Sequence, residues 1–164
     1  MRACVGPKVL VLGIGNLVMS DDGVGVKVVQ RLQREYRCDE SVEILDGGTL
    51  GLDLLPKLEG IDRLIVVDAV ETGECPGTCI RLVGEELPIA LETKVSPHQM
   101  GLKDLLSVAE LLGHSPPEMV LIGVQPGSIE MDTELTAVVE AKVEELIHMV
   151  LDELDTWGVR PHPI

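Results

Sequence analysis

The distribution of apolar residues along the chain predicts strands that alternate with helices. Mostly apolar runs at 9–12, 64–67 and 120–124 are typical of strands buried on both faces. Shorter strands are expected at 41–45 and 78–83. Apolar residues recur every three or four positions in the remaining segments, which predicts helices at 23–37, 52–58, 97–113 and 135–154.

This alternation predicts a mainly parallel, twisted sheet of about five strands with helices on both faces, a three-layer α/β/α sandwich. The runs at 9–12 and 64–67 are apolar throughout, so we expect them at the centre of the sheet. The 164 residues fit one domain, which we place at 1–157. The Pro-containing residues 158–164 are expected to form a flexible tail.

Composition narrows the classes of function. The net charge of −15 argues against nucleic acid as a partner, because the phosphate backbone would be repelled. No apolar run reaches the ~20 residues of a membrane span, and we see no signal peptide. We therefore expect a cytoplasmic protein that binds neither nucleic acid nor membrane. With one Trp, one Tyr and no Phe, its core must be aliphatic.

Four cysteines occur, and their spacing does not match a structural zinc site. Cys75 and Cys79 lie close in sequence, but no second pair of Cys or His residues accompanies them. We expect Cys4, Cys38, Cys75 and Cys79 to be free thiols in a reducing compartment.

Acidic residues follow the predicted strands, at the edge where open α/β sheets bind ligands. Asp22 comes after the first strand and Asp68 directly after the run at 64–67. A carboxylate at the end of a buried strand is costly unless it is paired, hydrogen-bonded or metal-bound. His98 begins a predicted helix, where the macrodipole keeps the imidazole neutral and able to bind metal. Two carboxylates and an imidazole suit zinc or nickel, with open positions for water or substrate. The alternative is that His98 is a surface or capping residue and Asp22 a helix-start acid.

Two other kinds of site fit the residues poorly. Gly13 and Gly15 follow a strand as in a dinucleotide site, but the third glycine is replaced by Val18. Asp21 and Asp22 would also repel a pyrophosphate there. No Gly-x-Ser-x-Gly motif indicates a serine nucleophile, and no cysteine directly follows a predicted parallel strand.

Five blocks of sequence, in order between residues 8 and 154, resemble the hydrogenase maturation endopeptidases. They are Gly13-Ile14-Gly15-Asn16 with Asp21-Asp22-Gly23-Val24-Gly25-Val26, Asp46-Gly47-Gly48-Thr49, Ile65-Val66-Val67-Asp68-Ala69, Ser96-Pro97-His98-Gln99, and Gly123-Val124-Gln125-Pro126. The resemblance implies a phosphorylase/hydrolase-like α/β/α fold and an endopeptidase, which we expect to be a monomer. Its substrate would be the nickel-loaded precursor of a nickel–iron hydrogenase large subunit, which loses a short C-terminal peptide.

The metal-binding and catalytic trio of that family corresponds to Asp22, Asp68 and His98. Some relatives have Glu at the position of Asp22. The resemblance implies nickel supplied by the substrate, with zinc or cadmium as replacements in crystals. The trio would bind the nickel, the metal or a carboxylate would polarise water, and Asp21, Asn16 or a backbone N–H would steady the oxyanion. Two alternatives stay open: a non-catalytic nickel-binding chaperone that uses the same trio, and a small-ligand domain with an acidic rim.

Overall fold

The computed structural model describes residues 7–87 and 97–164, with side chains described again from Leu102. Within these residues one five-stranded sheet has the order β3-β1-β4-β6-β5. Four strands are parallel and β5 runs antiparallel to β6, which confirms the predicted mainly parallel sheet. The strands are β1 (Val9–Ile14), β3 (Val42–Gly48), β4 (Arg63–Ala69), β5 (Cys79–Val83) and β6 (Glu118–Val124).

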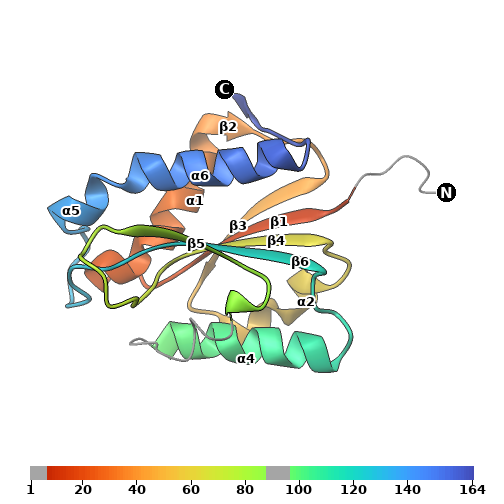
Figure 1. Cartoon of the computed structure of the whole chain (residues 1–164), viewed down its shortest axis with the longest axis horizontal. Helices are drawn as coiled ribbons and strands as arrows, with labels where there is room; N and C mark the ends of the chain where they lie inside the picture. Colours follow the sequence, from red (N-terminus) through yellow and green to blue (C-terminus); the bar gives the residue numbers. More distant parts are fainter. Residues whose placement is uncertain (1–6, 88–96) are drawn as a thin grey trace.

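Helices cover both faces of this sheet and make the three layers (Figure 1). One face carries α1 (Val24–Glu35) and α6 (Val143–Thr156), and the other carries η2 (Gly51–Leu54), α2 (Leu55–Leu58) and α4 (Pro97–Leu111). Side chains alternate along β1 between two aliphatic cores. Val9 and Val11 pack with the core under α1 and α6, whereas Leu10 and Leu12 pack with the core above α4.

The predicted central strands are central. β1 pairs with β3 on one side and β4 on the other, and β4 pairs with β1 and β6. Val11, for example, lies opposite Ile44 on β3 and Ile65 on β4. Strands that are paired on both sides and covered on both faces require an apolar residue at every position, which explains the continuous runs.

The last predicted helix is divided in two. α5 (Ala137–Glu140) ends in a tight turn, because Lys142 donates its N–H to the Val139 carbonyl three residues earlier at 2.9 Å, and α6 begins after it. The apolar spacing hides this break because Val139 and Val143, on either side of it, are both buried in one core.

The chain ends in a paired strand. β7 (His162–Pro163) pairs antiparallel with β2 (Tyr36–Arg37), and the Ile164 N–H donates to the Glu35 carbonyl at 2.9 Å. Part of the segment 158–164, which we expected to be a flexible tail, is therefore a paired strand. Residues 36 and 37 belong to β2, so α1 ends two residues before the predicted boundary.

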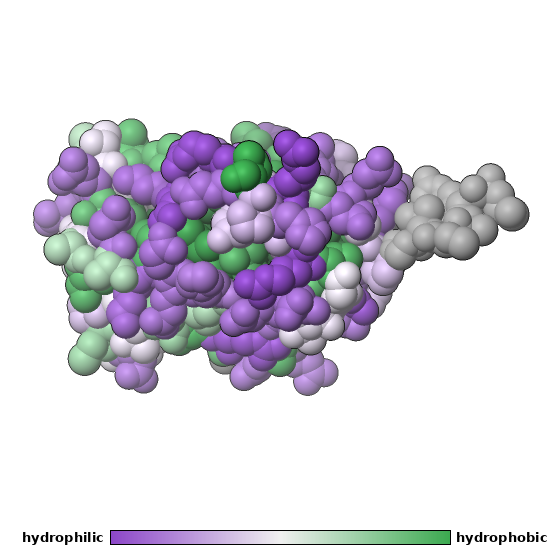
Figure 2. All heavy atoms as spheres, turned by 90° about the horizontal axis from the view of Figure 1, so that it is seen from above, coloured by the Kyte–Doolittle hydropathy of each residue, from purple (hydrophilic) through white to green (hydrophobic). Residues whose placement is uncertain are grey.

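The face above α6 is largely hydrophilic, with hydrophobic side chains in smaller groups (Figure 2). Acidic side chains on the outer side of α6 contribute to it: Glu144, Glu145, Asp152 and Asp155 are exposed. Among the described helices, none combines the length and the hydrophobicity that a membrane crossing needs.

Candidate active site

The carboxyl ends of the parallel strands meet at one end of the molecule, where α5 lies and α4 begins (Figure 1). Two of the predicted site residues lie at this end. Asp22 belongs to a short 3-10 helix, η1 (Ser20–Gly23), between β1 and α1, and only 3% of its surface is exposed. Asp68 is the second-last residue of β4 and is fully buried.

Gly25 brings the segments that carry Asp22 and Asp68 together. A Cβ atom at Gly25 would lie 2.0 Å from the Val67 carbonyl oxygen and 2.7 Å from that of Ile14. Only glycine therefore lets the first turn of α1 pack directly on the ends of β1 and β4. Since η1 also contacts β4, the backbone places Asp22 beside the end of the strand that carries Asp68.

Backbone N–H groups orient both carboxylates. Asp22 Oδ2 accepts a hydrogen bond from the Asn16 N–H at 3.2 Å, and Asp68 Oδ1 accepts one from the Ala69 N–H at 2.8 Å. Gly15 packs against the same segment, because a Cβ there would lie 2.0 Å from the Asp22 carbonyl oxygen. The Gly13-x-Gly15 turn thus supports Asp22, which explains glycines that we had compared with a dinucleotide motif.

His98 lies in the first turn of α4, as predicted from Pro97. Figure 1 shows that α4 begins at the end where the parallel strands finish. The His98 side chain falls outside the described residues, so its convergence with the two aspartates stays a prediction.

Asp21 differs from its neighbour Asp22. It is fully buried, and its carboxylate accepts four hydrogen bonds from Gly127, Ser128 and Thr136. A carboxylate has no hydrogen to donate to an oxyanion, and these contacts occupy both of its oxygens. The role in steadying an oxyanion that we considered for Asp21 does not fit this environment.

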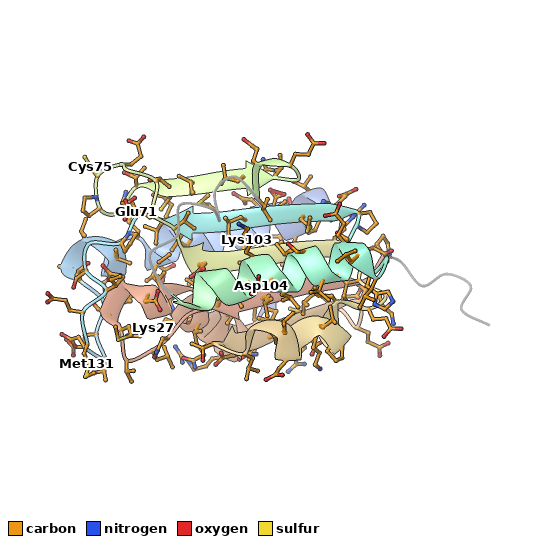
Figure 3. The ribbon with its side chains drawn as sticks, turned by 90° about the horizontal axis from the view of Figure 1, so that it is seen from below. Lys27, Glu71, Cys75, Lys103, Asp104 and Met131 are labelled. Carbon is orange, nitrogen blue, oxygen red and sulfur yellow. The ribbon has the colours of Figure 1, made fainter. Side chains whose placement is uncertain are left out.

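Gln125 is a buried polar residue whose role the sequence did not reveal. Its Oε1 accepts hydrogen bonds from the Thr72 N–H at 2.7 Å and hydroxyl at 2.9 Å, and its Nε2 donates to Glu71 at 3.0 Å. It thereby holds the loop between β4 and β5, which carries Glu71 and Cys75 (Figure 3). Its place directly after a buried strand and its membership of the block Gly123-Val124-Gln125-Pro126 were the signals in the sequence.

The cysteines of the described part of the chain are free, as expected: Cys38, Cys75 and Cys79. Burial raises the pKa of the Cys38 thiol. Burial, with the nearby Glu145 carboxylate, raises the pKa of Cys79 to about 11. Both thiols are therefore protonated at neutral pH and are poor nucleophiles.

Comparison with known proteins decides the family. The family model described as "Hydrogenase maturation protease" matches residues 26–153. The chain belongs to the hydrogenase maturation protease family. It is 41% identical over 157 residues to the hydrogenase 2 maturation protease of Escherichia coli (strain K12), covering 95% of this chain and 96% of the relative. It is 40% identical over 161 residues to the hydrogenase expression/formation protein HupD of Rhodobacter capsulatus, covering 97% and 77%.

Solved structures of hydrogenase maturation proteases share the fold. The hydrogenase maturating endopeptidase HybD from Escherichia coli superposes with a TM-score of 0.91 at 41% identity, over 95% of this chain and 97% of that one. The [NiFe] hydrogenase maturation protease HybD from Thermococcus kodakarensis gives a TM-score of 0.71 at 29% identity, over 90% and 98%. This chain is thus a hydrogenase maturation endopeptidase with the predicted α/β fold.

Proposed function

We propose that this protease removes a short C-terminal peptide from the nickel-loaded precursor of a nickel–iron hydrogenase large subunit. In this proposal Asp22, Asp68 and His98 bind the nickel that the precursor carries. One observation carries it: two carboxylates are buried, 3% and 0% exposed, where β1 and β4 end side by side. Burial of carboxylates costs free energy, and a metal ion that arrives with the substrate compensates it.

The chemistry of the donor set supports nickel as the recognised ion. Carboxylate oxygens and a neutral imidazole bind divalent metals of this class, and two or three protein ligands leave positions for the ligands of the precursor. The position of His98 in the first turn of α4 favours the neutral ring, because the positive end of the helix dipole disfavours imidazolium. Nickel is here part of the substrate.

The proposed reaction has three parts. Binding of the nickel by the trio places the scissile peptide bond beside the carboxylates. A water molecule, polarised by the metal or by one of the carboxylates, attacks the carbonyl carbon, and a carboxylate takes the proton. The tetrahedral intermediate then collapses, the C–N bond breaks, and the same carboxyl group gives the proton to the leaving amine of the released peptide. Asn16 is the donor that we assign to the oxyanion: its Oδ1 accepts the Val18 N–H at 3.1 Å, and Nδ2 is its donor group.

We further propose that the protease works as a monomer in the cytoplasm. The free thiols of Cys38, Cys75 and Cys79 suit a reducing compartment. The family and the curated relatives are proteases and maturation proteins, so the comparisons give no support to a chaperone without catalysis.

The test is incubation of the protease with purified large-subunit precursor, once loaded with nickel and once nickel-free, followed by intact-mass spectrometry. We expect a shortened large subunit and a released C-terminal peptide only with nickel. Complex formation without peptide release would indicate the chaperone. Cleavage that is equally fast with nickel-free precursor would overturn nickel recognition while leaving the peptidase intact.

A further inference from the structure

The Asp21 carboxylate holds one loop of the protein through four hydrogen bonds. Its Oδ2 accepts from the Gly127 N–H at 2.8 Å, the Ser128 N–H at 3.1 Å and the Thr136 hydroxyl at 2.7 Å. Its Oδ1 accepts from the Thr136 N–H at 2.8 Å. All these donors belong to residues 127–136, between β6 and α5. Hydrogen bonds to a charged acceptor are the strong ones, so Asp21 is a main contact between this loop and η1.

The same loop holds the backbone immediately before Asp21. The Ser20 N–H donates to the Asp132 carbonyl at 2.8 Å, the Asp132 N–H donates to the Val18 carbonyl at 3.0 Å, and the Ser20 hydroxyl donates to the Glu134 carbonyl at 2.9 Å. Ser20 has φ +52°, a conformation that costs free energy in any residue with a side chain. The loop contacts keep Ser20 in this conformation.

A third contact joins the loop to α1. Lys27 Nζ donates to the Thr133 carbonyl at 2.8 Å. In Figure 3 Lys27 and Met131 lie at the same corner of the molecule, at the end where the parallel strands finish. The loop is therefore attached before, within and after η1, the element that carries Asp22.

Asp22 depends on this arrangement because it is the next residue of the same short helix. On its other side it contacts Gly15 and Asn16 of the turn after β1. A four-residue 3-10 helix has few internal hydrogen bonds, so its orientation is set by these outside contacts. Release of the loop on the Asp21 side would let η1 rotate and move the Asp22 carboxylate.

We propose that Asp21 is a positioning residue of the peptidase: through Gly127, Ser128 and Thr136 it sets where the Asp22 carboxylate lies. Asp21 does not touch the substrate and acts only through its neighbour. The inference rests on the proposed role of Asp22 in the reaction. It explains why two adjacent buried aspartates follow β1: one is bound within the protein and holds the other in place.

The test compares Asp21→Asn with two control variants. Asn replaces one acceptor oxygen by an N–H₂ group that faces N–H donors, so the loop contacts of that oxygen are lost and the charge that strengthens the others is removed. Asp46→Asn is the matched control: Asp46 is also a carboxylate at the end of a strand, and it accepts from Gly48 at 3.0 Å and Gln30 at 3.2 Å, donors that belong to β3 and α1. Val150→Ala, in the core under α6, provides a loss of thermal stability far from the site.

The rate of peptide release is measured at saturating nickel-loaded precursor, well below the unfolding temperature of every variant. We expect Asp21→Asn to lower kcat by about tenfold to 100-fold, because small displacements of reacting groups have effects of this size. Asp46→Asn and Val150→Ala should retain the wild-type kcat. If Asp21→Asn and Val150→Ala lose the same amount of Tm and their kcat values differ by less than about twofold, Asp21 has only a structural role. That result would overturn the proposal.

Thr136→Val is the milder variant if Asp21→Asn does not fold. It removes one hydrogen bond to Asp21, whereas Thr136→Ser keeps the hydroxyl and should restore the rate. We expect Thr136→Val to lower kcat less than Asp21→Asn does. We expect Thr136→Ser to have the wild-type kcat. An unchanged kcat with Val, or no recovery with Ser, would contradict the proposal.

A second readout needs no nickel and no precursor. Amide hydrogen exchange at Ser20 and Asp132 in the free protease should become about tenfold faster in Asp21→Asn, while exchange in β1 and β4 stays unchanged. Unchanged exchange at Ser20 and Asp132 would show that Asp21 does not hold the loop. If the wild type itself fails to cleave nickel-loaded precursor, the proposed function fails, and this exchange experiment still tests the contact.

Discussion

The two ends of the sheet differ in the burial of charged side chains. At the carboxyl end Asp21, Asp22 and Asp68 are buried. At the amino end acidic and basic residues stay near solvent, where they line a hollow and form surface pairs such as Lys57–Glu43 at 3.4 Å. Both side chains of that pair are about half exposed, 51% and 50%.

In this strongly acidic protein, exposed charges and buried charges have different roles: the exposed ones interact with water, and the buried ones require a partner. Exposed charges cost little, and single surface pairs contribute at most about 1 kcal/mol. Buried carboxylates need compensation by hydrogen bonds or by a bound ion. Asp21 receives it from four hydrogen bonds within the protein. Asp22 and Asp68 also accept backbone hydrogen bonds, and we assign the nickel of the substrate to them as a further partner. Three predictions test the contrast.

The largest effect is expected at the two ends of α4. His98→Ala should lower the rate of precursor processing by at least about 100-fold, because it removes the nitrogen donor of the proposed site. His114→Ala is the control, since His114 follows the other end of the helix and is only half-buried. Processing is followed by gel mobility of the large subunit. Normal processing by His98→Ala would show that the imidazole is not needed for the reaction.

Substitutions of glycines at the two ends of the sheet should also differ in their effect on the free energy of unfolding. Gly25→Ala places a Cβ 2.0 Å from the Val67 carbonyl oxygen, and we expect a loss of about 3 kcal/mol or more in the free energy of unfolding. Gly60→Ala, before β4, meets no atom within 4 Å and bears only the strain of φ +78°, about 1 kcal/mol. Urea unfolding measures both. Equal losses would show that α1 does not need the close approach.

The smallest effect concerns the cysteines. Cys75 is exposed and should react with iodoacetamide about tenfold faster than Cys79 at pH 8. The pKa of Cys79 is raised from 9.0 to about 11, so the thiol is neutral in folded and unfolded chains below pH 9. Between pH 9 and about 11 only the unfolded chain ionises, and folding stability falls as pH rises. Equal labelling rates would contradict the burial of Cys79.

The sequence predicted the parts of the molecule that depend on local pattern. The runs at 9–12 and 64–67 identified the central strands, because full burial requires apolar residues at every position. Asp68 was chosen because a carboxylate at the end of a buried strand is costly. Asp22 was chosen by its place after the first strand. Their position at one end of the sheet follows from parallel strands alone.

The features that sequence reading missed depend on contacts between distant segments. The hydrogen bonds from Thr136 to Asp21 join residues 115 positions apart. The pairing of β7 with β2 joins the C-terminus to the end of α1. Neither leaves a periodic signal. The division between α5 and α6 was hidden because the apolar spacing continues through the turn.

Substitution of Asp68 by Asn tests the central claim, that the Asp22 and Asp68 carboxylates serve the reaction and not the fold. Asn can keep one oxygen as the acceptor for the Ala69 N–H, while it removes the charge and replaces the other oxygen by an N–H₂ group. We expect the free energy of unfolding to stay within about 1 kcal/mol of wild type or to rise. Processing of nickel-loaded precursor should fall by about 100-fold or more. Glu43→Gln, at the amino end, should change neither. A marked loss of stability with processing retained would show that Asp68 is a structural residue and would contradict the account.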